Sequence, residues 1–269
     1  MKEPLPLLNH ALGAPTAFFP KDLVEAVRVK RRLPHEPVPE VCVLEFDGDL
    51  TDWLVATGAA KPCESWACFH TKMFSMEVDG ISCGIVPRTI GGPYSVLVAE
   101  QMSVSGARVV LGLTSAGRVA TRMPVPGLVV ATSAVRDEGT SYHYSPPAPT
   151  IEAPGTTAKL LKAELRGGPL PLLSGKVWTT DAPYRETQVQ LDSHAKAGVL
   201  AVEMQAASLF AFSAARRFPV GMVAIVTNRV GLTGEAFDKG TRHLELEILR
   251  GVCRAGERFV STPGFSRGA

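Results

Sequence analysis

The sequence has little net charge. Its 269 residues hold 28 Lys and Arg against 26 Asp and Glu, which leaves a formal net charge of +2. This balance argues against a general nucleic-acid or anionic-membrane binder, because both of these partners require a strongly basic surface. The one basic run, residues 28–32, is interpreted as a solvated helix face. We therefore expect neither nucleic acid nor membrane among the partners.

Cofactor and metal signatures are also missing. The five cysteines form no paired metal-ligand spacing and the six histidines are scattered, so no metal is expected. Gly91-Gly92 and Gly112 do not form the Gly-x-Gly-x-x-Gly fingerprint, which argues against a nicotinamide enzyme. Thiols without a pairing pattern, no stretch resembling a signal peptide and no run of membrane-spanning length favour a cytoplasmic protein.

The chain divides into an irregular beginning and one large α/β domain. Seven prolines interrupt residues 1–39, where we expect a single short helix over 22–31. From residue 40 to 269, short apolar runs alternate with helical patterns, and no internal repeat is present. The proline-rich stretch 144–155 is expected to be a rigid surface loop, because no second core-sized unit lies beyond it.

The apolar runs predict buried strands and the periodic stretches predict helices. Strands are expected at 41–46, 83–86, 108–111, 128–132, 176–179 and 220–227, and helices at 50–59, 94–105, 156–164, 208–217 and 239–257. Strands that are apolar throughout favour a mixed, largely parallel sheet covered on both faces. In such a fold, ligands bind at the carboxyl ends of the strands.

One stretch combines an acid with apolar neighbours in an unusual way. Glu203 and Met204 stand side by side, and an apolar helical run follows through Ala215. An unpaired buried carboxylate is costly, whereas a sugar-binding pocket uses one to accept hydroxyl hydrogen bonds, with a thioether packed on the ring. The alternative is a helix whose first turn carries Glu203 to complement the helix dipole.

Several motifs accompany this stretch in a fixed order. They are Ile90-Gly91-Gly92-Pro93-Tyr94-Ser95, Gly112-Leu113-Thr114-Ser115-Ala116-Gly117, residues 135–144 (VRDEGTSYHY), residues 178–187 (WTTDAPYRET) and residues 224–229 (AIVTNR). In this order and spacing they resemble the nucleoside phosphorylase superfamily, specifically its uridine phosphorylase branch, over roughly residues 41–260. The resemblance implies a single-domain, three-layer α/β fold that cleaves the N-glycosidic bond of a nucleoside.

The resemblance assigns the sugar to the stretch that contains Glu203. Glu203 is expected to accept the ribose hydroxyls, and Met204 to pack on the ribose ring. The family usually has a second glutamate where this chain has Gln205. Because glutamine carries one acceptor oxygen and no charge, we expect weaker ribose binding or tolerance of deoxy sugars.

The resemblance favours a pyrimidine base. Purine-cleaving relatives place an aspartate where this chain has Asn228. The base-binding residues that the resemblance implies are Thr180, Asp181, Tyr184, Arg185, Asn228 and Arg229. Arg229 and Arg185 are the candidate catalytic residues, because a guanidinium donates to a uracil carbonyl as negative charge grows there. The alternative is that Arg185 and Glu186 form a surface ion pair and Tyr184 belongs to the core.

The match to the family is weakest at the nucleophile. Gly48 and Ser115 fall on phosphate-binding positions, and Arg88 is close in sequence to the expected site. The three arginine positions of the family read instead as Asp52, Phe69 and Gly112. Burying phosphate without cations is costly, so two outcomes stay open.

In the first outcome the enzyme is a phosphorylase, with phosphate as co-substrate and no cofactor. In the second it is a nucleosidase that uses water, with Asp47, Asp49 or Asp52 as general base, although these acids equally suit a helix N-terminus. A nucleoside-binding protein without catalysis is the third alternative. Relatives form dimers or hexamers, so we expect a homo-oligomer in which the segment around Asn9-His10 reaches a neighbouring subunit.

Overall fold

The computed structural model describes residues 5–229 and 241–263. Its helices are α1 (Pro20–Arg31), α2 (Asp49–Ala56), α3 (Gly92–Ser105), α4 (Gly155–Leu165), α5 (Gln188–Lys196), α6 (Ala206–Arg216) and α7 (Arg242–Ser261). Three 3₁₀ turns are η1 (Pro6–Leu8), η2 (Thr140–His143) and η3 (Pro183–Arg185). The strands are β1 (Val41–Glu45), β2 (Ala60–Pro62), β3 (Phe74–Val78), β4 (Ile81–Pro87), β5 (Val109–Arg118), β6 (Gly127–Asp137), β7 (Thr150–Glu152), β8 (Leu172–Thr180), β9 (Ala201–Glu203) and β10 (Val220–Arg229).

The sheet is mixed and partly closed on itself. Its order is β10-β6-β8-β9-β5-β1-β4-β3-β2, and β10 also pairs with β5, so β5, β9, β8, β6 and β10 form a ring. The sheet contains two series of parallel strands. The first series is β4-β1-β5-β10 and the second is β6-β8-β9. Antiparallel pairs join the two series and add β2, β3 and β7.

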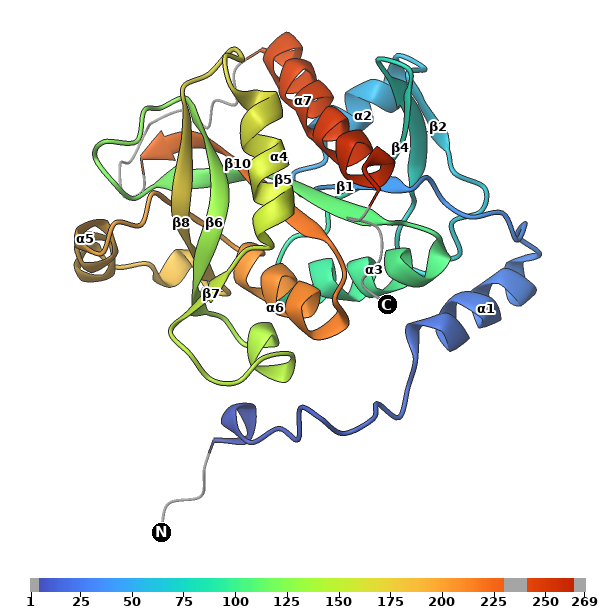
Figure 1. The fold of residues 1–269 in the computed structure, drawn as a ribbon, viewed down its shortest axis with the longest axis horizontal. Helices are drawn as coiled ribbons and strands as arrows, with labels where there is room; N and C mark the ends of the chain where they lie inside the picture. Colours follow the sequence, from blue (N-terminus) through green and yellow to red (C-terminus); the bar gives the residue numbers. More distant parts are fainter. Residues whose placement is uncertain (1–4, 230–240, 264–269) are drawn as a thin grey trace.

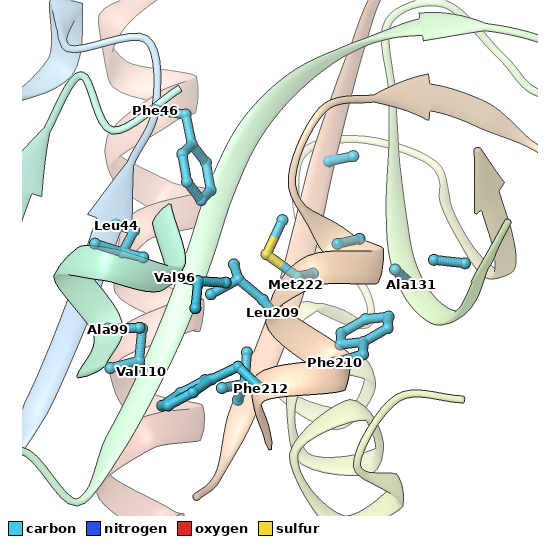
Figure 2. Packing of buried hydrophobic residues seen from close by; sticks show 14 of the residues in the cluster. Leu44, Phe46, Val96, Ala99, Val110, Ala131, Leu209, Phe210, Phe212 and Met222 are labelled. Carbon is cyan, nitrogen blue, oxygen red and sulfur yellow. The ribbon is translucent and has the colours of Figure 1, made fainter. Parts of the chain in front are cut away.

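Helices cover both faces of the sheet, which confirms the predicted three-layer α/β class (Figure 1). On one face, α2, α4 and α7 pack on strand residues such as Val43 and Leu111. On the other face, α3 and α6 bury Val96, Leu209 and Phe212 against the sheet, as Figure 2 shows. Two covered faces explain why the central strands begin as continuous apolar runs and carry polar residues mainly toward their carboxyl ends.

The N-terminal segment lies against the second of these faces. The helix predicted at 22–31 is α1, which buries Val24 and Val27 and packs beside α3. Before it, residues 5–19 contain only the turn η1, which contacts η2. In the described residues we find no helix that combines the length and the apolar character needed to cross a lipid bilayer.

Several elements were not predicted from the sequence. They are α5 and the short strands β2, β3, β7 and β9. The helix α5 begins at a capping box, in which the side chains of Thr187 and Gln190 each accept a hydrogen bond from the other residue's backbone N–H. The prediction that Glu203 stands at the start of a helix is wrong. Glu203 is the last residue of β9, and α6 begins only at Ala206. The predicted start of the last helix, Lys239, lies outside the described residues.

The close packing around Gly112 makes a prediction about stability. A Cβ at this position would lie 2.1 Å from Met222 Sδ and 2.9 Å from Phe46 Cε2, so this part of β5 has no room for a side chain. Gly112→Ala should therefore lower the free energy of unfolding by about 1–3 kcal/mol, measured by denaturant titration. The matched control is Gly155→Ala, where a Cβ meets nothing within 4 Å. Equal stability of the two variants would contradict the packing described here.

Candidate functional site

A cavity of about 670 Å³ opens where several strands end. It is lined by Phe46, Asp47, Ile90, Thr114, Ser115, Ala116, Gly117, Pro183, Tyr184, Glu186, Val202, Glu203, Met204, Gln205 and Asn228. These residues come from the carboxyl ends of β1, β5, β9 and β10 and from the turn η3. The strand ends that were expected to hold a ligand therefore do enclose a cavity, and its volume suits a small molecule.

Glu203 forms the floor of this cavity and is 5% exposed. Its Oε2 accepts the N–H groups of Gln205 (2.7 Å) and Ala206 (2.8 Å), and its Oε1 accepts the Thr179 hydroxyl at 2.5 Å. A carboxylate offers about four acceptor positions, so three of them are used inside the protein and about one remains. Burial raises the pKa of Glu203 to about 7, against the effect of these donors.

Glu203 combines a place in the cavity wall with a role at the start of α6. The carboxylate lines the cavity, and it also satisfies the first N–H groups at the start of α6, where the helix dipole favours negative charge. Its position is fixed from three directions, by β8 through Thr179, by β9 and by α6. A rigidly held acceptor costs little conformational entropy when a ligand hydroxyl binds to it.

Met204 and Gln205 continue the same wall of the cavity. The Gln205 side chain is buried, and its Oε1 accepts the backbone N–H of Met204 at 3.0 Å. The acceptor of this amide is therefore engaged within the loop, and its NH₂ group is the part that can serve a ligand. A glutamate here would present a second negative charge beside Glu203, and glutamine avoids that repulsion.

Ser115 also lines the cavity and is held by Asp47. The Ser115 hydroxyl donates to Asp47 Oδ1 at 2.8 Å, and the Ser115 N–H donates to Asp47 Oδ2 at 3.1 Å. Ser115 is one of the residues predicted to bind phosphate. In this structure its hydroxyl and its N–H both donate to a carboxylate of the chain itself.

The other two predicted phosphate ligands are engaged in the same way. Gly48, at φ +93°, donates its N–H to Glu45 Oε1 at 2.7 Å. Arg88 lies across Gly48 and forms a bidentate ion pair with Asp52, with 3.0 Å between Nη1 and Oδ1. The Arg88 guanidinium lowers the pKa of Asp52, so this side chain is held as a carboxylate whose negative charge is balanced by the arginine. Gly48, Arg88 and Ser115 thus lie near one another at the ends of β1, β4 and β5, and a carboxylate occupies the donors of each.

The predicted base-binding residues fall into two groups. Tyr184 and Asn228 line the main cavity, with Tyr184 exposed at its mouth and not in the core. Thr180, Asp181 and Arg185 line a separate cavity of about 180 Å³ on the other side of η3.

Two of these residues have structural partners. Asp181 Oδ2 accepts the Gly139 N–H at 2.9 Å, and Thr180 Oγ1 accepts the Ala182 N–H at 3.2 Å. Arg229 ends β10, paired with Arg118 of β5, and its side chain lies outside the described part of the structure.

Glu186 is a cavity residue that the sequence analysis did not assign to the site. It lines both cavities, directly before α5, and burial raises its pKa to about 7. A signal in the sequence could have indicated the position of Glu186. The capping-box pattern of Thr187 and Gln190 predicts a helix that begins at Gln188, and therefore a turn at Glu186. A carboxyl group facing Glu203 and Met204 across the cavity provides a group able to bind the N–H of a planar ring.

Comparison with known proteins agrees with this geometry. The family model described as "Phosphorylase superfamily" matches residues 41–253, and the chain belongs to this superfamily. The match contains every strand described above, from β1 to β10, and most of α7.

Individual relatives are more distant. The chain is 29% identical over 159 residues to a guanosine phosphorylase of Halorubrum lacusprofundi, over 58% of this chain and 64% of that protein. It is 25% identical over 169 residues to a uridine phosphorylase of Salmonella typhimurium, over 57% of this chain and 66% of that protein. It is 27% identical over 260 residues to a uridine phosphorylase of Haemophilus influenzae, over 88% and 90%. The chain thus spans just under two thirds of the first two relatives.

The raised pKa of Glu186 predicts a pH-dependent contribution to stability. The native carboxyl binds its proton up to about pH 7, whereas its ordinary pKa is 4.5, so the native state holds more protons between these values. Stability contributed by Glu186 therefore falls as the pH rises through this window. Glu186→Gln should gain thermal stability relative to the parent chain on going from pH 5 to pH 8, measured by Tm. The exposed Glu77→Gln is the matched control, and parallel Tm curves for all three proteins would exclude this role of burial.

Proposed function

We propose that this protein cleaves the N-glycosidic bond of a nucleoside by phosphorolysis, releasing the base and ribose 1-phosphate. The observation that carries the proposal is the cavity at the strand ends, which gathers Glu203, Met204, Gln205, Ser115 and Asn228 in a chain of the phosphorylase superfamily. The proposed reaction uses phosphate as co-substrate and needs no other cofactor.

The sugar is proposed to lie over Met204, with a hydroxyl on the remaining acceptor position of Glu203. Bond cleavage develops positive charge on the sugar and negative charge on the leaving base, so the ionised form of Glu203 is favourable near the sugar. Since burial raises the pKa of Glu203 to about 7, sugar binding should strengthen as the pH rises through that value. The Gln205 amide is proposed to donate to the second hydroxyl.

The base is proposed to lie between Asn228, Tyr184 and Glu186. The amide of Asn228 both donates and accepts, which suits the alternating groups of uracil, and this is our reason for proposing a pyrimidine nucleoside such as uridine. Arg229 is proposed to donate to the uracil carbonyl as charge develops, since its backbone follows Asn228 at the end of β10. Arg185 is proposed for the same role only after a movement of η3, because it now lines the neighbouring cavity.

Phosphorolysis requires the Asp47 carboxylate to leave the Ser115 donors, because two anions repel at this distance. Hydrolysis is the second candidate function, and the bond between Asp47 and Ser115 is the observation that favours it. A carboxylate held at the nucleophile position is placed to remove a proton from water. Both reactions break the same bond, and they differ in whether phosphate or water attacks the anomeric carbon.

A homo-oligomer, either a dimer or a hexamer, is proposed on the basis of the cavity mouth. Three large apolar or aromatic side chains are exposed around it or on the adjoining loop: Ile90, Tyr184 and Phe69. A second copy of the chain would cover them and close the cavity to water. We also propose a cytoplasmic location, which agrees with five free cysteines. His10 stacks on His143 of its own chain, with ring centroids 4.0 Å apart, so reaching a neighbour would require release of this contact.

Substrate choice can be measured directly. Uridine, thymidine, inosine and adenosine are supplied at equal concentration, with and without phosphate, and free base and sugar product are quantified. We expect the fastest cleavage with a pyrimidine nucleoside, in the presence of phosphate, with ribose 1-phosphate as product. Faster turnover of inosine or adenosine would overturn the pyrimidine assignment, and nucleoside binding without turnover would indicate a binding protein.

Removal of the sugar acceptor should impair catalysis. Glu203→Ala deletes a charge-assisted hydrogen bond to the ribose, a loss of about 2–4 kcal/mol in transition-state binding, so kcat/KM should fall by about 30-fold to 900-fold. Because Glu203 also holds the start of α6, the Tm of each variant is measured alongside, and Glu203→Gln tests the charge with less loss of packing. A folded Glu203→Ala variant with the parent activity would disprove the sugar assignment.

Asp47→Asn separates the two nucleophiles. If phosphate attacks, removing the negative charge beside Ser115 should lower the KM for phosphate by about tenfold or more, since close like charges repel by about 4 kcal/mol at an effective dielectric of about 20. If water attacks, loss of the general base should lower the hydrolytic rate by about 100-fold or more. Asp49→Asn, on the first turn of α2, is the control. An unchanged phosphate KM together with an unchanged rate would remove Asp47 from the reaction.

A further inference from the structure

The motif at residues 135–144 has so far received no role in the reaction. It joins the end of β6 to η2, behind the wall that carries Glu203. Arg136 is buried within it, and its guanidinium donates to the Ser141 hydroxyl (2.8 Å), the Pro146 carbonyl (2.6 Å) and the Ser145 carbonyl (3.1 Å). This arginine thus holds the loop in one conformation, because a planar guanidinium donates in fixed directions.

Glu138 is the residue of this loop that bonds to α6, the helix that directly follows the proposed sugar ligands at 203–205. It is 7% exposed, and its Oε2 accepts the Ser141 N–H at 2.9 Å and the Ser208 hydroxyl at 2.6 Å. Its Oε1 is buried and has no hydrogen-bond partner within the described ranges. Burying a carboxylate with one oxygen unsatisfied is costly, so a purely structural role would be served better by a neutral residue.

Ser208 connects Glu138 to the residues that line the cavity. It lies in the first turn of α6, the turn whose start is held by Glu203 through Gln205 and Ala206 and by Thr179 through Ala207. This first turn is therefore fixed by two carboxylates, Glu203 on the cavity side and Glu138 on the opposite side. Any displacement of Ser208 would move the loop 203–205 that carries the proposed sugar ligands.

The packing around Ser208 leaves little freedom for such a displacement. Gly92, at the start of α3, lies so close that a Cβ would stand 2.1 Å from Ser208 Oγ and 3.4 Å from Thr140 Oγ1. The glycine at position 92 is thereby explained by a close contact between the starts of α3 and α6. The Ser208 hydroxyl is confined to the direction of Glu138.

We propose that Glu138 is a positioning residue of the sugar site, which aligns the loop 203–205 through Ser208 and places a second negative charge behind Glu203. The proposal rests on the nucleoside-cleaving function argued above. It assigns no contact between Glu138 and the substrate, and it gives the motif at 135–144 a role in catalysis.

The charge of Glu138 shifts the pKa of Glu203 in a direction that can be measured. Burial is the main cause of the raised pKa of Glu203, and the charge of Glu138 raises it further. Glu138→Gln removes this charge and keeps an oxygen that can accept from Ser208, so the pKa of Glu203 should fall. If sugar binding requires ionised Glu203, the acidic limb of the kcat/KM profile should move to lower pH.

Three variants of the full-length chain test the proposal. Glu138→Gln removes the charge, Ser208→Ala removes the connecting hydroxyl, and Ser213→Ala is the matched control, because Ser213 is a buried serine of the same helix whose hydroxyl donates to Phe218 at the other end. The measurements are amide hydrogen exchange of residues 205–208, the pH profile of kcat/KM, and KM and kcat for uridine.

We expect Glu138→Gln to move the acidic limb down by about half a pH unit or more, the direction that removal of a nearby like charge gives. Ser208→Ala should speed exchange at 205–208 and raise the KM for uridine by about fivefold to tenfold, because a less rigidly held loop loses more conformational entropy when it binds the sugar. Ser213→Ala should change neither quantity.

An unmoved pH profile in Glu138→Gln together with parent-like exchange and KM in Ser208→Ala would overturn the proposal. If Glu138→Gln does not fold, Ser208→Ala alone decides, and parent-like exchange and KM in that variant contradict the positioning role. Failure of the proposed function has a different outcome, namely no turnover by the parent protein with any nucleoside. In that case hydrogen exchange still reports whether Glu138 and Ser208 hold the first turn of α6.

Discussion

The buried carboxylate of Glu203 joins the parts of this protein on which the cavity depends. It accepts from the end of β8 through Thr179 and from the start of α6 through Gln205 and Ala206, and it belongs to β9 itself. Desolvating a carboxylate is expensive, and three charge-assisted hydrogen bonds together with the helix dipole offset part of that cost, since the pKa of Glu203 is still raised to about 7. The same residue lines the cavity. The interactions that make the buried charge tolerable therefore also fix its position in the cavity wall.

Carboxylates also dominate the ends of β1, β4 and β5, where the superfamily resemblance places cations. Glu45, Asp47 and Asp52 engage Gly48, Ser115 and Arg88, respectively. Each donor is thereby satisfied in the absence of phosphate, which removes the cost of an unpaired buried N–H or guanidinium. The consequence is that any anion entering here competes with an acid of the chain. Asp47 is the acid in that set whose partner, Ser115, lines the cavity with it.

Much of the fold could be predicted from the sequence, because long apolar runs and periodic helices give strong signals. The strands β1 and β10 and the helices α3 and α6 lie close to their predicted ranges. The strands β5 and β6 begin where the patterns placed them but continue beyond the predicted ranges 108–111 and 128–132, to Arg118 and Asp137. The short strand β9 could not be predicted, since three residues before an apolar helix show no period of their own. As a result the apolar pattern places Glu203 at the start of a helix, whereas the residue ends β9.

The candidate site was predictable where neighbours in sequence are neighbours in space. Residues 203–205 line the cavity together, as expected. The pairing of Asp47 with Ser115 joins residues 68 positions apart, and only the parallel register of β1 beside β5 brings them into contact. Arg185 and Glu186 show on a smaller scale that neighbours in sequence can differ in their surroundings. Arg185 lines only the smaller cavity, whereas Glu186 lines both cavities.

The central claim is that the cavity between Glu203 and Ser115 holds a nucleoside and its attacking group. A crystal structure of the protein with uridine and phosphate tests it most directly. The account predicts the ribose over Met204 with a hydroxyl on Glu203, the base beside Asn228, and Asp47 either displaced from Ser115 by phosphate or holding a water below the sugar. A nucleoside bound elsewhere, with this cavity empty at saturating uridine, would contradict it.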